Sequence, residues 1–258
     1  MYVNKRIHTL MITVLCCLMS GSVRAGHNYN GPYTGENLDR VAFPMGGIGA
    51  GMICLEGTGA LSHWSLKNRP DIFREHQVFT AICIKGPDGN MARVLEGPIP
   101  KWKIFSIHPG TGRYAGPGHG LGDLTYGLPR FREAEFAARF PFAQVTLADT
   151  KMPVRVEITG WSPFTPPDTD ASSLPMIGLE YQFHNRSDQD VDAVFSFNAR
   201  NIMKVSGARD AIRPIDQGFV LAQPASPKIK AWDEGYLAVF TDNPSTKVNC
   251  AWFRGGWY

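Results

Sequence analysis

The segment Val154-Arg155-Val156-Glu157-Ile158-Thr159 alternates strictly between apolar residues and polar or charged residues. Because successive side chains of a β-strand point to opposite faces, this alternation predicts a strand with one face in a core and the other in water. The same alternation returns in 177–184 and in 191–197. A polar, turn-rich segment at 185–190 separates these two stretches, so the sequence predicts that they form an antiparallel hairpin.

Further strands are predicted on both sides of these segments. Residues 78–84 are almost continuously apolar, which is typical of a strand covered on both faces, and a turn at 86–90 leads into a strand at 91–95. The pattern of 131–138 fits a short helix and a strand equally well. Additional candidate strands are 143–147, 218–222, 235–241 and 247–253. Because no stretch has a persuasive helical stripe, we expect an all-β fold, a two-layer antiparallel β-sandwich of the supersandwich kind.

The glycine-rich segment Gly46-Gly47-Ile48-Gly49-Ala50-Gly51 invites comparison with a phosphate-binding loop. Its spacing is not Gly-x-Gly-x-x-Gly, and no Lys-Ser or Lys-Thr pair follows it. We interpret these glycines as allowing tight turns or close packing of the backbone. A second glycine-rich segment, 108–127, is predicted to be a long surface loop.

The first 25 residues have the character of an export signal. Lys5 and Arg6 precede an uncharged, largely apolar run at 9–19, and Val23-Arg24-Ala25 fits the small-residue rule for cleavage. The apolar run is too short to predict a stable membrane span. The sequence therefore predicts cleavage near Ala25 and an exported, periplasmic or secreted domain formed by residues 26–258. The paired cysteines at 16 and 17 lack the small preceding residue of a lipid anchor, which favours a soluble exported protein over a lipoprotein.

The charge and the cysteines exclude several classes of function. Removal of the signal leaves 23 basic and 23 acidic residues, so the mature chain has no electrostatic footprint for nucleic acid. Cys54, Cys83 and Cys250 then remain as an odd, widely spaced set. We interpret them as small buried hydrophobic residues, and whether one pair forms a disulfide stays open. Because no cysteine or histidine pair has metal-binding spacing, we expect neither a metal ion nor another cofactor.

The acidic residues give no sign of a catalytic pair. Hydrolysis of a glycosidic bond usually needs two carboxylates, one of them held protonated by its surroundings. The acidic residues in loop-like segments are Asp71, Glu75, Asp123, Asp168 and Asp170, and nothing in their context marks them as buried or paired. Asp168 and Asp170 follow Pro166-Pro167 and fit the role of turn caps. No Gly-x-Ser-x-Gly motif supports acyl transfer either.

Tryptophan offers a different kind of sugar contact. A flat apolar ring complements the C–H face of a pyranose, although tryptophan in a β-sandwich belongs more often to the core or to an interface. Of the six tryptophans, Trp64 and Trp102 lie beside polar or basic residues, so they are our candidates for stacking on a sugar. Asp168 is added as a candidate neighbour of the substrate.

Four stretches in order resemble the amino-terminal domain of glycoside hydrolase family 116, the β-glucosidase and non-lysosomal glucosylceramidase family. In that family an aliphatic-Pro-Leu-Gly-Gly-Ile-Gly run precedes a Gly and a Trp, and here Met45 takes the place of the usual Leu, a volume-conserving change. The resemblance covers residues 37–258. The matching stretches are 41–51 with 61–64, then 126–131, then 139–143 with 153–166 and 173–175, and finally 253–258.

The resemblance implies a β-sandwich packed against a following (α/α)6 barrel. In the family, the barrel carries the glutamate nucleophile and the aspartate acid/base of a retaining mechanism, so no catalytic residue is transferred to this chain. The sequence stops on Trp257-Tyr258 in the middle of an apolar pattern, from which we expect a truncated gene, a split reading frame or an incomplete record.

We therefore predict the accessory domain of a retaining β-glycosidase, inactive alone, which meets a carbohydrate or glycolipid substrate through the missing barrel. This interpretation predicts a large exposed apolar patch where the barrel docks. One alternative is a free-standing carbohydrate-binding β-sandwich, which predicts exposed tryptophans aligned in a groove. Another is a structural or adhesion domain without a ligand.

Overall fold

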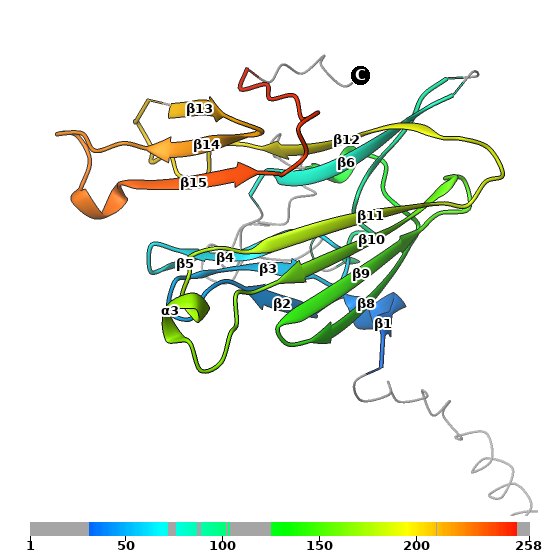
Figure 1. Cartoon of the computed structure of the whole chain (residues 1–258), viewed down its shortest axis with the longest axis horizontal. Coiled ribbons are helices and arrows are strands. Elements are labelled where there is room, and N and C mark those ends of the chain that lie inside the picture. Colours follow the sequence, from blue (N-terminus) through cyan, green and yellow to red (C-terminus); the bar gives the residue numbers. More distant parts are fainter. Residues whose placement is uncertain are drawn as a thin grey trace, which may run out of the picture. The chain divides into compact units, whose positions relative to one another are not determined.

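A computed structural model describes residues 31–71, 76–86, 89–101, 103, 125–209 and 211–251 (Figure 1). Residues from Pro32 onward form one compact unit. The predicted signal at 1–25 and most of the predicted glycine-rich loop at 108–127 lie outside the described residues.

The largest sheet has five antiparallel strands in the order β1-β8-β9-β10-β11. These strands are β1 (Tyr33–Thr34), β8 (Glu133–Arg139), β9 (Phe142–Ala148), β10 (Val154–Trp161) and β11 (Gly178–Asn185). The short helix α3 (Thr169–Ser172) lies in the connection from β10 to β11.

Three smaller antiparallel sheets complete the fold. The first contains β2 (Ala42–Met45), β3 (Met52–Glu56), β4 (Leu61–Leu66) and β5 (Arg69–Asp71) in that order. The second, in the order β12-β6-β7, contains β12 (Asp192–Ala199), β6 (Val78–Lys85) and β7 (Met91–Val94). The third contains β13 (Ala211–Ile215), β14 (Gly218–Gln223) and β15 (Gly235–Phe240). Three single 3-10 turns are η1 (Gly35–Leu38), η2 (Thr125–Gly127) and η3 (Ala231–Asp233). The predicted all-β sandwich is confirmed.

The alternating residues of β9 and β10 build the core as predicted, whereas Phe183 on β11 and Phe195 on β12 are 39% and 41% exposed, so the prediction of a buried face fails there. On β10, Val154, Val156 and Ile158 are at most 3% exposed, and the side chains between them lie on the outer face of the sheet. Ala143, Val145 and Leu147 on β9 are buried in the same way. Residues of β2, β3, β4 and β6 join the same hydrophobic cluster, so the large sheet forms one layer and two smaller sheets form the other. Burying each such aliphatic side chain contributes about 1.5–3 kcal/mol before the cost of ordering it.

The predicted hairpin between 177–184 and 191–197 is wrong, although both segments are strands. β11 pairs over its full length with β10, whereas β12 pairs over its full length with β6 in the other layer (Figure 1). The polar segment at 185–190 therefore crosses between the layers. Tyr181 on β11 faces Phe195 on β12 with ring centroids 4.9 Å apart, so their apolar faces pack against each other rather than side by side in one sheet.

Other strand predictions have mixed outcomes. The strands at 78–84 and 91–95 form the β6–β7 hairpin, and those at 143–147, 218–222 and 235–241 are confirmed as β9, β14 and β15. The undecided segment at 131–138 is a strand, β8. No strand forms over 247–251, and the rest of that candidate lies outside the described residues. There the Asn249 side chain accepts a hydrogen bond from Ala251 N at 2.9 Å, a local turn that competes with strand pairing.

Candidate functional site

Trp64, a predicted sugar-stacking residue, lies in the core. Its side chain points inward from β4, and the residue is 3% exposed. The indole Nε1 donates a hydrogen bond to the Leu61 carbonyl at 3.3 Å, and the ring meets His76 edge-on with centroids 5.3 Å apart. A ring enclosed in this way is not presented to a sugar in this structure.

Of the other two predicted site residues, Asp168 has a local structural role. Asp168 caps α3, because its carboxylate accepts a hydrogen bond from Ala171 N at 2.9 Å. This contact matches the turn-capping role that the sequence suggested for it. Trp102 lies outside the described residues.

A buried charged cluster surrounds Glu56 at the end of β3. The Lys103 ammonium forms an ion pair with Glu56 Oε2, and both side chains are 6% exposed. Glu56 Oε1 lies 3.6 Å from His63 Nδ1 and has no hydrogen-bond partner. Burial, with Glu56 nearby as a second cause, raises the pKa of the Cys54 thiol to about 11, so this thiol stays protonated and unreactive.

Ser62, His63 and Glu56 resemble a catalytic triad in composition but not in geometry. Ser62 Oγ lies 2.6 Å from His63 Nδ1, the same nitrogen that Glu56 approaches. A triad needs the nucleophile and the carboxylate on opposite ring nitrogens, so that the imidazole can take a proton from one while the other orients it. The cluster therefore has the geometry of a partly buried structural network.

Two more buried carboxylates are also paired with cations. Arg93 Nε lies 3.3 Å from Asp149 Oδ2, and Arg130 Nε lies 3.1 Å from Glu96 Oε2. Burial acts to raise the pKa of Asp149, but the Lys151 N–H and Arg93 outweigh it and hold this pKa below its usual range. Each buried carboxylate in the described part of the chain thus pairs with a cationic side chain.

Metal binding and membrane crossing find no support in the described ranges. No group of three or more His, Cys, Asp or Glu side chains there is arranged to hold a metal ion. Among the same residues, no helix has the length and apolar character needed to cross a bilayer.

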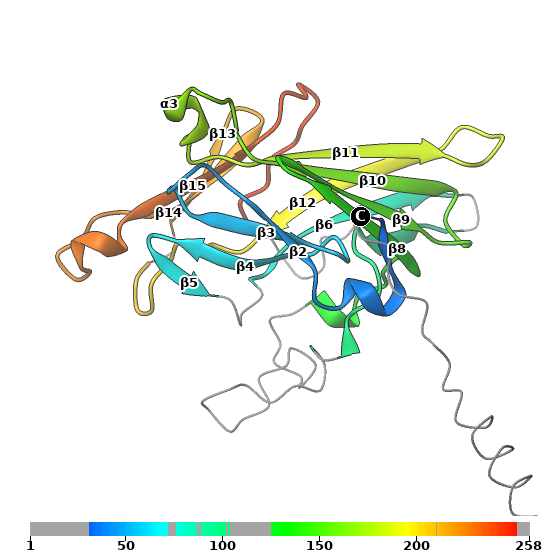
Figure 2. The same ribbon diagram turned by 90° about the horizontal axis from the view of Figure 1, so that it is seen from below.

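One group of exposed apolar side chains lies at one end of the large sheet, and others lie on β7, β11, β12, η3 and β15. Phe140, in the β8–β9 turn, contacts Phe164, in the loop before α3, with ring centroids 4.7 Å apart. The ribbon views place α3 and the β8–β9 turn at this same end (Figures 1 and 2). We call this the end surface, and its members are at least 39% exposed: Ile48, Phe140, Phe142, Phe164, Leu174 and Met176.

Close backbone packing of the glycine-rich loop holds the end surface together. Ile48 N donates a hydrogen bond to the Ser172 carbonyl at 2.9 Å, which joins the loop to α3. A Cβ atom on Gly47 would lie 2.1 Å from the Leu174 carbonyl oxygen, so the approach requires glycine. The structure confirms that these glycines serve close packing, and it shows what they pack against.

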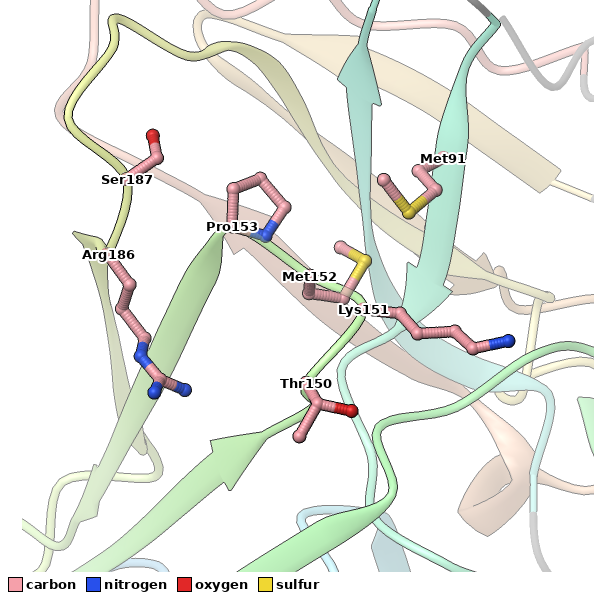
Figure 3. Close-up of a pocket in the computed structure, with 7 residues that line it drawn as sticks. All are labelled: Met91, Thr150, Lys151, Met152, Pro153, Arg186 and Ser187. Atoms are coloured by element: carbon pink, nitrogen blue, oxygen red, sulfur yellow. The ribbon is translucent and has the colours of Figure 1, made fainter.

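A separate depression lies among the β9–β10 turn, the β11–β12 connection and β7. It has a volume of about 550 Å³ and is lined by Met91, Thr150, Lys151, Met152, Pro153, Arg186 and Ser187. Figure 3 shows Lys151 and Arg186 extending in different directions rather than converging on a common point. The lining includes no carboxylate, histidine or cysteine, so it offers no acid/base or nucleophilic group.

The fold and these contacts define an antiparallel β-sandwich domain with paired buried charges and an exposed apolar end. Residues 42–245 match the family model described as beta-glucosidase 2, glycosyl-hydrolase family 116 N-term. The chain belongs to this family of N-terminal domains and is thus an accessory domain of a glycoside hydrolase. A comparison with curated proteins found no match.

The end surface could not be located from the sequence. Its members come from three segments far apart in the chain, and all of them except Phe142, the first residue of β9, lie in turns or loops. Most of these members lie in stretches that the sequence marked for their resemblance to the family rather than for exposure, namely 41–51, 139–143, 153–166 and 173–175.

Proposed function

We propose that this chain is the N-terminal accessory domain of a retaining β-glycosidase of the β-glucosidase or glucosylceramidase type. Its role is to support a helical (α/α)6 catalytic domain that supplies both catalytic carboxylates. The family match over residues 42–245 is the observation that carries this proposal. The carbohydrate or glycolipid substrate then meets the protein through that catalytic domain.

The end surface supports this role because it is suited to docking another domain. Monomeric domains rarely leave a contiguous group of large apolar side chains in water. Here Phe140 is 61% exposed, Phe142 53% and Ile48 61%, and the loops that carry them are linked by hydrogen bonds rather than loose. A rigid apolar surface of this kind gains free energy when a partner covers it.

The buried ion pairs support our proposal that this domain does not catalyse hydrolysis on its own. A glycosidase of the usual kind needs two carboxylates that face the substrate, whereas a carboxylate engaged by a cationic Lys or Arg side chain is already held by a protein partner. Glu56, Glu96 and Asp149 all have such a cationic partner.

The export signal predicted at 1–25 supports a periplasmic or secreted location for the protein.

Hydrolysis of an aryl β-glucoside tests the proposal. The purified chain should release the aryl group no faster than buffer does. Turnover that survives purification and is abolished in a Glu56→Gln variant still folded by circular dichroism, but not in Glu180→Gln on the outer sheet face, would place a catalytic carboxylate within this domain and overturn the proposal.

A further inference from the structure

Trp232 is unlike the other tryptophans that the structure describes. Trp64 is 3% exposed and Trp161 is half-buried over Gly178, but Trp232 in η3 is 62% exposed. The Lys230 ammonium lies 5.1 Å from the centre of the Trp232 ring, a cation–π contact that restrains the indole. One large aromatic surface is thus held in water next to a charged group.

Tyr236 is the second residue of β15, and a side-chain contact restrains its ring as well. It is 55% exposed, and its hydroxyl donates a hydrogen bond to Glu234 Oε1 at 3.1 Å. Because side chains of a strand alternate, Phe240, which is 71% exposed, lies on the same face of β15 as Tyr236. Three exposed aromatic side chains therefore occupy one short stretch of chain, 232–240.

The segment that carries these rings is fixed to the sandwich. The Arg69 guanidinium lies 2.7 Å from Asp233 Oδ1, and Lys67 Nζ donates a hydrogen bond to the Asp233 carbonyl at 2.6 Å. Lys67 and Asn68 form the tight turn between β4 and β5, both with a φ of 54°. The β4–β5 hairpin thus holds η3 in place, and the exposed rings sit on a rigid base.

We propose that Trp232 and Tyr236 form a binding site for the neutral sugar rings of a glycan chain. The open face of each aromatic ring complements the C–H face of a pyranose, and the restrained rings lose little conformational freedom on binding. The Glu234 carboxylate accepts hydrogen bonds and the Lys230 ammonium donates them, and a sugar hydroxyl group can both donate to the first and accept from the second. This activity goes beyond docking of a catalytic domain and does not depend on it.

The charges around the rings favour a neutral ligand over an anionic one. Lys230 and Glu234 oppose each other in sign, and the Asp233 carboxylate is paired with Arg69. Two further cations, Lys67 and Arg213, lie close to Asp233 and Tyr236 respectively. Because the Asp233 and Glu234 carboxylates lie among these cations, a phosphate or an acidic polymer meets repulsion as well as attraction. The rings are also interleaved with polar residues, in contrast to the direct ring-to-ring contact of Phe140 and Phe164 on the end surface. Intermittent rings with polar neighbours suit a hydroxylated ligand better than a protein core.

Calorimetric titration of the purified chain with cellohexaose and with soluble laminarin tests the proposal. We expect millimolar or tighter binding to at least one of the two, weakened about tenfold or more by Trp232→Ala and less by Trp232→Phe. Phe140→Ala is the matched control, since Phe140 is 61% exposed but lies on the end surface. Circular dichroism checks that each variant folds.

Absence of binding to both glycans by the folded wild-type chain would overturn the proposal. So would Trp232→Ala binding as tightly as the wild type, or an equal loss in Phe140→Ala. These outcomes concern sugar binding alone, so they are distinguishable from hydrolysis by the chain, which would instead contradict the accessory-domain proposal.

Discussion

The Phe140 ring lies edge-on against the Phe164 ring, with centroids 4.7 Å apart and ring planes at 71°, although the two residues are 61% and 39% exposed. Edge-to-face packing of this kind usually belongs to a core or an interface. Here it joins the β8–β9 turn to the loop before α3 at the surface of the sandwich. The contact therefore makes the end surface a preformed apolar platform rather than a set of isolated exposed residues.

Replacing both rings should remove the exposed apolar character without unfolding the domain. In Phe140→Ser/Phe164→Ser, we expect binding of the dye ANS to fall and solubility to rise, since the lost side chains contact water more than core. The free energy of unfolding should change by about 1 kcal/mol or less. Gln182→Ser, on the polar outer face, is the control and should leave dye binding unchanged. Equal dye binding by the double variant and the wild type would contradict this assignment.

The buried pair of Glu56 and Lys103 should behave as a structural ion pair. Glu56→Gln leaves the Lys103 ammonium buried without its partner charge and should destabilise the fold by about 3–5 kcal/mol. The matched control is Asp192→Asn in the exposed pair of Lys85 and Asp192, 3.4 Å apart, where the loss should be below about 1 kcal/mol. Urea unfolding measures both losses. A small effect at Glu56 would show that the pair is not enclosed as the structure indicates.

The alternating pattern of the sequence predicts which side chains of a strand are buried, but not which strands pair with each other. Alternation placed Val156 and Ile158 correctly in the core, because it reports which face of a strand is covered. It does not report which strand is the neighbour, and the hairpin prediction failed for that reason: β11 and β12 each find a full-length partner elsewhere. Pairing depends on contacts between distant segments that no local pattern contains.

The candidate site shows the same limit. The polar neighbours of Trp64 suggested that its side chain is exposed. In the structure the indole turns inward, next to His63 with a φ of 48° and to a shift in the β3–β4 register. Burial of a side chain depends on this local geometry as well as on composition. Trp232 was counted among possible sugar-stacking residues but not singled out. Its exposure follows from η3, which the sequence did not predict.

The glycine-rich loop provides a matched pair of substitutions. Gly47→Ala should cost about 3 kcal/mol, because its Cβ would lie 2.1 Å from the Leu174 carbonyl oxygen and backbone must move. Gly49→Ala should cost about 1–2 kcal/mol, since Gly49 has a φ of +74° but no atom within 4 Å of the added Cβ. Thermal and urea unfolding give both values. A smaller cost at Gly47 than at Gly49 would contradict the close contact with the α3 loop.

Stability should fall in acid partly through Asp149. Its pKa is held below its usual range in the folded protein, so folding favours the ionised carboxylate. This contribution is present above the unfolded-state pKa of about 4 and is lost as pH falls through the lower folded-state pKa. Asp149→Asn should therefore be less stable than wild type at pH 6, with a flatter decline between about pH 5 and pH 3. Asp188→Asn, in the exposed 185–190 segment, is the control. Parallel curves for Asp149→Asn and wild type would contradict the assigned cause.

Association with a catalytic domain tests the accessory role most directly. Sedimentation or calorimetry should detect complex formation between the chain and a separately expressed helical catalytic domain of a family 116 glycosidase. We predict that Phe140→Ser/Phe164→Ser abolishes this association, whereas Trp232→Ala leaves it unchanged. If the folded double variant binds the catalytic domain as tightly as the wild type does, the end surface is not the docking surface.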